Sequence, residues 1–574
     1  MKECDLVMRG GITSGVVYPR AITELSKTYR FRSVGGTSAG AIAAALTAAA
    51  QYNAKAGGFE RLGKIPDQIS NQLKAFFQPY PELRKVYRRL MGLNSRKNKL
   101  GFWPLVRWFT WNFYLFFKLS DKLNKRNFGL CPGTTVHYAK NKHQYPVPGL
   151  IDWLNGWIEY VSGRIDRHDA ELPGIPLTFG ELEANNKSDT DSVTLRMVTT
   201  DLSEGVSVTL PISDNGHAAS HHHTRQYYLL KSDLDWLVPD NVKQHLISEH
   251  SAEDLPDYVM LPKDGDMPVI LAVRMSMSFP LLFSAVPVYR KDPTLCEEHC
   301  PVQRDQLQRC YFADGGIASN FPIHFFDSLL PTRPTFAINL TEYNKCRHGD
   351  DPGSGPLINR VTMPEKTGEG MLLPIDPIGG WLKYAWKIVE TARNWQDNVQ
   401  MTLPGYRERI VSIALKDEQE GGLNLGMKSA LVDKLTGLGT LAAHRIVDGL
   451  NGDQPFNFEA HRWRRLLALT AAMDEALQKF TSVYKDAPEW DPELLSIREM
   501  LERYHDDFDN PKYQEWGYQP AQSDQVKALL DRWDVINNVA EKWSQAALAD
   551  WQLPHPKPDI RITSSTVGDQ ISAR

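Results

Sequence analysis

The segment 34–40, with the sequence VGGTSAG, places Ser38 at the centre of a G-x-S-x-G pattern, between a short apolar stretch and an alanine-rich one. This pattern predicts a buried strand that turns sharply into a helix, with the serine hydroxyl exposed on the turn. Gly36 and Gly40 suit such a turn, because side chains there would obstruct it. Ser38 is therefore a candidate nucleophile. The amides that begin the helix, starting at Ala39, can stabilise a negatively charged oxygen.

The order of elements before Ser38 does not fit the usual α/β-hydrolase topology, in which several strands precede the serine. Residues 5–8 predict a short buried strand, and residues 16–27 predict a helix with one apolar face. Residues 31–34 then predict the strand that enters the turn. Only about one strand-and-helix unit therefore precedes the candidate nucleophile.

Two further glycine-rich segments carry candidate chemistry. Residues 9–15, RGGITSG, offer backbone N–H groups at Gly10 and Gly11 that no side chain shields. Such a loop can hold an oxyanion or a phosphate, although a plain tight turn is the simpler interpretation. Residues 311–316, YFADGG, end an apolar strand with Asp314. A carboxylate there can take a proton from a nearby serine, but Asp-Gly is also a common turn sequence.

Taken together, the three segments resemble the patatin-like phospholipase family, in which a serine–aspartate dyad replaces the catalytic triad. The resemblance places the nucleophile on Ser38 and the base on Asp314, with oxyanion donors at Gly10, Gly11 and Ala39. The glycines that match the motifs around these residues are Gly15, Gly36, Gly40, Gly315 and Gly316.

The resemblance covers roughly residues 4–345, and residues 9–15 match the family only in part. Ile12 stands where a third glycine is usual, and Ser14 where a basic residue is usual, so Arg9 is considered as a source of the missing charge. His324, ten residues after Asp314, lies at the start of an apolar run that is expected to be helical. It is interpreted as a packed or surface histidine rather than a triad member.

The fold that the resemblance implies is a three-layer α/β/α arrangement with a central, mostly parallel sheet, a helical insertion and a helical C-terminal extension. We expect a catalytic domain over residues 1–345, with an insertion at about 84–127. Residues 346–450 extend the core with a strand at 410–415, and a helical region follows over 451–574.

The implied activity is lipid acyl hydrolysis. Asp314 would take the Ser38 proton as the hydroxyl attacks an ester, and water would release the fatty acid from an acyl-serine. No cofactor or metal is expected. A metal site at His217 and His221–His223, or zinc at Cys296, Cys300, Cys310 and His299, is the less favoured interpretation of those clusters.

The composition and charge of the chain limit which partners and which cellular compartment we expect for it. Its net charge of -4 gives no basis for a nucleic-acid partner, and six cysteines in 574 residues suit a reducing compartment. No signal peptide precedes the first expected strand, so we expect a cytoplasmic, peripherally membrane-associated enzyme. If such an enzyme attacks membranes, a regulatory ligand, a partner or a homo-oligomer must restrain it, as in bacterial immune effectors of the family.

One segment suggests contact with an anionic membrane surface. Residues 84–126 contain twelve Lys or Arg and one acid, and residues 100–119 are rich in aromatic side chains. A buried helix pair that covers the active site is the alternative. The docking candidates are Trp103, Arg107, Trp108, Trp111 and Phe113.

Two other functions remain open from the sequence. The protein could be a nucleotide-binding or sensing module that uses the Gly10–Gly15 loop, or a membrane-docked scaffold without catalysis. Labelling of Ser38 by a fluorophosphonate would separate the enzyme from both, because only an activated serine reacts.

Overall fold

The computed structural model describes residues 1–11, 14–69, 72–94, 120–136, 147–184, 192–213, 226–291, 306–349, 358–365, 369–370, 372–373, 375, 378, 381–416, 420–421, 424–450, 452–490, 494–511, 522–545 and 554–555.

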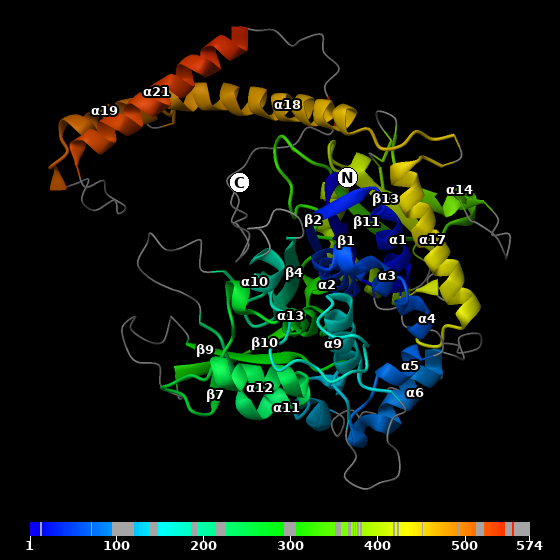
Figure 1. Ribbon diagram of the computed structural model, residues 1–574. Helices are drawn as coiled ribbons and strands as arrows, with labels where there is room; N and C mark the ends of the chain where they lie inside the picture. The colour runs from blue at the N-terminus through cyan, green and yellow to red at the C-terminus, as the bar shows by residue number, and fades with distance from the viewer. Residues whose placement is uncertain are drawn as a thin grey trace.

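Most of the described strands form one large mixed sheet (Figure 1), and a parallel group lies at its centre. In spatial order this group is β13 (Ile410–Leu415), β11 (Thr335–Glu342), β1 (Lys2–Met8), β2 (Tyr29–Thr37) and β4 (Thr194–Asp201). The strand expected at 410–415 is therefore part of the same sheet as the N-terminal strands.

Antiparallel strands extend both sides of the parallel group. Beyond β4 come β10 (Leu307–Asp314), β9 (Val286–Lys291), β6 (Tyr228–Leu230) and β7 (Tyr258–Met260), while β5 (Val206–Leu210) also pairs with β4. At the other edge β12 (Val361–Thr362) pairs with β13. The short strands β3 (Gly129–Cys131) and β8 (Leu281–Phe283) pair with each other.

Alternate residues of the central strands point to opposite faces of the sheet, and each face has its own core. Leu6 and Met8 of β1 belong to the larger core, which contains α1 (Tyr18–Leu25), α2 (Ala39–Tyr52), α9 (Leu150–Val161), α13 (Val269–Ser276) and α17 (Ser429–Val447). Val7 belongs to a second core with Phe321, Phe325 and Met401, where Met401 comes from α15 (Trp381–Thr402). The three-layer α/β/α architecture is confirmed.

Helix α2 is enclosed on several sides, because it packs against β2, α9 and α13. Its alanine-rich sequence lets these elements approach closely, and most of its residues are buried. Helix α17 comes from the second half of the chain and packs along α1 (Figure 1).

The remaining described helices are mostly short, and the longest of them form the C-terminal extension. Helices α18 (Phe458–Lys485), α19 (Ile497–Asp506) and α21 (Ser523–Gln545) pack on one another around a small apolar cluster, and they reach away from the sheet (Figure 1). The other helices are α3 (Gly58–Leu62), α4 (Ile65–Ile69), α5 (Leu73–Phe76), α6 (Arg84–Asn94), α10 (Phe179–Ala184), α11 (Leu234–Leu237), α12 (Asp240–Glu249) and α14 (Lys345–His348).

The apolar run around His324 forms turns rather than the start of a helix, and its backbone closes through bonds such as Phe325 N–H to the Pro322 carbonyl. The docking candidates Trp103, Arg107, Trp108, Trp111 and Phe113 lie outside the described residues. None of the described helices combines the length and the apolar character that spanning a bilayer requires.

Candidate active site

Ser38 lies on the turn between β2 and α2, in a backbone conformation that few residues with side chains adopt. Its φ is 55° and its ψ is -124°. The turn closes tightly, because a Cβ on Gly36 would lie 2.4 Å from the Gly40 carbonyl oxygen, and one on Gly40 would lie 2.2 Å from that of Met8. Both positions therefore require glycine, and the strained turn presents the serine at the end of the strand.

Sheet register brings Asp314 close to Ser38, although its strand β10 pairs with the opposite edge of β4 from β2. Thr37, which precedes the serine, pairs with Val198 of β4, and Asp314 at the end of β10 pairs with the adjacent residue, Thr199. Gly315 allows this approach, since a Cβ there would lie 2.0 Å from the Val198 carbonyl oxygen.

The Asp314 carboxyl is buried, and its surroundings raise its pKa to about 6. Burial is the dominant cause, because it disfavours the charged form. The Ser38 hydroxyl, the Gly316 amide and the positive charge of Arg393 act in the opposite direction and lower the pKa. The raised pKa makes this carboxylate a stronger base than an exposed aspartate.

The contact between the two side chains is looser than a full hydrogen bond. Asp314 Oδ1 accepts a hydrogen bond from the Gly316 N–H at 2.8 Å. Its Oδ2 atom is buried and has no hydrogen-bond partner within the described residues, although Ser38 is near enough to lower the Asp314 pKa. Contacts between a nucleophile and its base commonly tighten when a substrate binds.

The glycine loop passes directly beside the nucleophile. A Cβ on Gly10 would lie 3.2 Å from Ser38 Cβ, and Gly15 packs against Ala39. The Gly10 N–H donates to the Asn320 carbonyl at 2.9 Å, so this amide is already engaged, unlike the free donor that the sequence led us to expect. The amides of Gly11 and Ala39 donate to no carbonyl in the described part of the chain.

Asn320 connects the three motifs, and sequence reasoning missed it. Its carbonyl accepts hydrogen bonds from the Gly10 N–H and from Thr37 Oγ1. Its own N–H donates to Asp397 of α15 at 2.9 Å, as does the Phe321 N–H. Asp397 is buried, and burial raises its pKa, while the two amides, Ser319 and Arg9 lower it. No motif in the sequence marks either residue.

Arg9 does not supply the charge that Ser14 leaves missing. Its guanidinium donates to Asn339 Oδ1 at 2.7 Å and to the Leu340 carbonyl, at the end of β11. The Tyr18 hydroxyl donates to the Arg9 carbonyl at 2.6 Å. Arg9 and Tyr18 therefore anchor the glycine loop, and Arg393 is the basic residue whose charge acts on Asp314.

The other candidate residues lie apart from this site or outside the described residues. The His324 ring packs edge-on against Phe325, and Cys310 is buried in β10. The other residues of the two metal candidates lie in the undescribed ranges 214–225 and 292–305. Where the structure describes the chain, no group of three or more His, Cys, Asp or Glu could hold a metal ion.

Two solved structures are similar to this chain at low sequence identity. VipD from Legionella pneumophila is 12% identical, with a TM-score of 0.31, over 96% of this chain and 88% of that one. The ExoU–SpcU complex from the type III secretion system of Pseudomonas aeruginosa contains a chain that is 13% identical, with a TM-score of 0.22, over 95% of this chain and 89% of that one.

Sequence comparison gives a more specific result. A protein of Rhizobium meliloti (strain 1021) described as an RpoH suppressor is 30% identical over an alignment that spans 98% of each chain. The family model for patatin-like phospholipase matches residues 6–209 and 234–327. These two ranges contain Ser38, Asp314, the glycine loop and Asn320. The chain therefore belongs to the patatin-like phospholipase family, a family of lipid hydrolases.

Proposed function

We propose that the protein is a lipid acyl hydrolase that cleaves the ester bonds of membrane phospholipids, with Ser38 as nucleophile and Asp314 as base. The observation that carries this proposal is a buried carboxyl of raised pKa beside a serine on a strained turn. Two residues 276 positions apart in the chain are held together by the pairing of β2 and β10 with the same strand.

The reaction would proceed in two balanced halves. Ser38 Oγ attacks the ester carbonyl carbon while Asp314 accepts the hydroxyl proton, and the carbonyl oxygen becomes an oxyanion. When this intermediate collapses, the alcohol leaves with the proton from Asp314, and the acyl group stays on Ser38. A water molecule then attacks the acyl carbonyl, again giving its proton to Asp314. Collapse of the second intermediate returns that proton to Ser38 and releases the fatty acid.

The donors for the oxyanion would be the amides of Gly11 and Ala39. Ala39 begins α2, so its N–H lies at the positive end of the helix dipole. In well-studied enzymes each such donor lowers the barrier by about 3–4 kcal/mol. Gly10 is not a donor in this proposal, because its own amide is bound to Asn320. It instead leaves space beside Ser38, since it has no side chain there.

Peripheral membrane association is the second part of the proposal, and helix α15 supports it. Because an α-helix has 3.6 residues per turn, a single stripe of α15 about 60° wide contains Tyr384, Ile388, Trp395 and Val399. All four are more than half exposed. The stripe is apolar, whereas the buried opposite side of α15 includes Asp397. Most surface helices show the reverse pattern.

The position of this stripe suits a substrate that lies in a bilayer. Trp and Tyr favour the boundary between water and lipid, and α15 is the helix whose other side holds the loop after Asp314. Leu372 and Ile375, just before α15, are about nine-tenths exposed. A membrane bound to this surface would lie close to the dyad. An enzyme seated there would need restraint by a ligand, a partner or self-association.

The nucleotide-binding alternative receives less support. A phosphate-binding loop uses its glycine amides as donors, but the Gly10 amide is bound to Asn320. A scaffold without catalysis would not need a buried carboxyl beside the serine, because burial of that charge destabilises the fold.

Labelling by a fluorophosphonate tests the chemistry directly. The wild-type protein should be labelled on Ser38, and it should release fatty acids from mixed phospholipid vesicles, as measured by mass spectrometry. Ser38→Ala should lose both activities, whereas Ser482→Ala, on the exposed surface of α18, should keep both. Fatty acid release by a folded and uncontaminated Ser38→Ala protein would refute the proposal.

A further inference from the structure

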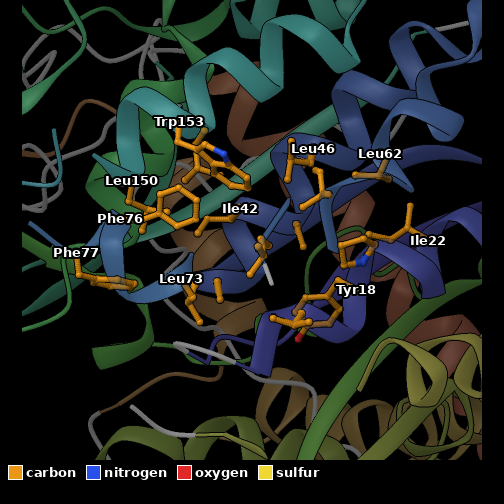
Figure 2. Close-up of a pocket in the computed structure, with 18 residues that line it drawn as sticks. Tyr18, Ile22, Ile42, Leu46, Leu62, Leu73, Phe76, Phe77, Leu150 and Trp153 are labelled. Carbon is orange, nitrogen blue, oxygen red and sulfur yellow. The ribbon is translucent and has the colours of Figure 1, made fainter. Parts of the chain in front are cut away.

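An apolar cavity lies in the helical layer next to the nucleophile (Figure 2). Its volume is about 90 Å³, several times the roughly 10–15 Å³ that one buried water needs. No lining side chain carries a charge, and the Tyr18 hydroxyl is bound to the Arg9 carbonyl.

The cavity begins at the residue that follows the nucleophile. One face of α2 lines it, and this face consists of Ala39, Ile42, Ala43 and Leu46, which are three or four residues apart. Gly15 faces Ala39 at this end, where a Cβ on Gly15 would lie 3.1 Å from Ala39 Cβ. The end of the cavity nearest to Ser38 is therefore lined by small residues.

The opposite end is closed by larger side chains. From Ala39 to Leu46 the helix rises about 10 Å. Ile22 and Leu62 lie near Leu46 in Figure 2, and both are fully buried. Phe76 and Trp153 form the wall on the other side, with their rings 4.7 Å apart. The cavity is thus a short channel along α2, from the residue after the nucleophile to side chains buried inside the protein.

We propose that this channel binds the acyl chain of the ester that Ser38 attacks, and that Ala43 and Leu46 limit the length of chain accepted. The inference rests on the proposed function and adds a selectivity for chains of medium length. A methylene group transferred from water into such a channel gains about 0.8 kcal/mol, which corresponds to about fourfold in kcat/KM for each added methylene until the channel is full.

Esters of one alcohol with butyrate, octanoate and palmitate test the length limit. The wild type should prefer octanoate. Ala43→Leu adds bulk inside the channel and should lower the ratio of octanoate to butyrate hydrolysis by at least about tenfold, given fourfold for each excluded methylene. Leu46→Ala should move the preference towards palmitate. Leu466→Ala on α18, which is partly exposed, is the matched control and should keep the wild-type profile.

A binding measurement separates this inference from the proposed chemistry and does not require the channel variants to fold. Ser38→Ala protein should bind octanoate more tightly than butyrate in a calorimetric titration, even if the wild type hydrolyses no ester. Equal affinity for the two acids would overturn the inference, as would an unchanged chain-length profile in folded Ala43→Leu and Leu46→Ala proteins. Loss of fluorophosphonate labelling alone would instead count against the proposed function.

Discussion

The carboxylate of Asp397 accepts a hydrogen bond from the backbone N–H of Asn320, 77 residues earlier in the chain. The Asn320 carbonyl in turn accepts hydrogen bonds from the Gly10 amide and from the Thr37 hydroxyl. Gly10 lies in the glycine loop, and Thr37 directly precedes the nucleophile. Helix α15 therefore holds the loop after Asp314, the glycine loop and the turn of Ser38 in a single network. Residues well beyond the motifs contribute to the geometry of the site.

Replacing Asp397 should impair both stability and catalysis. Asp397→Ala leaves the buried amides of Asn320 and Phe321 without an acceptor, at a cost of about 1–3 kcal/mol for each. We expect a lower melting temperature and a kcat on a soluble ester reduced by about tenfold or more, because a small displacement of the site slows the reaction. Asp397→Asn keeps an acceptor oxygen and should restore much of the kcat. Asp531→Ala, on the exposed side of α21, is the control, and a wild-type kcat in Asp397→Ala would contradict the positioning role.

The pH dependence of catalysis should follow Asp314. The base must be ionised to accept the Ser38 proton, so kcat/KM should rise with pH through about 6 and level off above it. The positive charge of Arg393 lowers the Asp314 pKa, so Arg393→Gln should move the midpoint of the profile to higher pH. Initial rates on a soluble ester across a pH series measure both effects. A midpoint near that of an ordinary aspartate would show that the base lies elsewhere.

Asp314→Asn should stabilise the fold while abolishing activity. The pKa rises from 3.8 to about 6 on folding, so the unfolded chain binds fewer protons between these values. The contribution of this group to stability is therefore present below about pH 4 and lost as the pH rises to about 6. At neutral pH the loss approaches about 3 kcal/mol, from 1.36 kcal/mol per pKa unit. Melting temperatures at pH 8 should be higher for Asp314→Asn than for the wild type, and the difference should shrink towards pH 4. A lower melting temperature at pH 8 would argue against a destabilising buried charge.

The exposed stripe of α15 should govern vesicle binding. The double change Ile388→Ser and Trp395→Ser removes two large apolar side chains, each of which contributes about 1.5–3 kcal/mol when fully buried. We expect sedimentation with phosphatidylglycerol-containing vesicles to weaken by at least about tenfold. Measured on a Ser38→Ala background, the result does not depend on hydrolysis. Trp490→Ser, at an even more exposed tryptophan, should bind as the wild type does. A change in molecular mass by light scattering, with vesicle binding intact, would identify the stripe as a contact between copies of the chain.

The local parts of the site could be predicted from the sequence because their causes are local. Gly36 and Gly40 are needed by a turn of a few residues, and Ser38 lies on that turn. The strands and helices around it follow from short apolar patterns, as at β1, β2 and α2. The expectation for residues around His324 was wrong, because an apolar run that packs under a sheet need not be helical.

The contacts between distant segments could not be predicted in the same way. The engagement of the Gly10 amide by Asn320 and the direction of the Arg9 side chain towards β11 depend on elements more than 300 residues away. The raised pKa of Asp314 depends on how completely the surrounding layers bury it. None of these three effects leaves a periodic pattern or a motif in the sequence.

The sequence by itself determined the strained turn of Ser38, the glycine loop beside it and the aspartate at the end of a strand, since backbone conformation and apolar periodicity are properties of neighbouring residues. Only the tertiary structure decided that β4 brings Ser38 and Asp314 together, that Asp397 anchors their loops and that an apolar cavity borders Ala39. Sheet register, burial and hydrogen bonds between remote segments arise only when the whole chain packs.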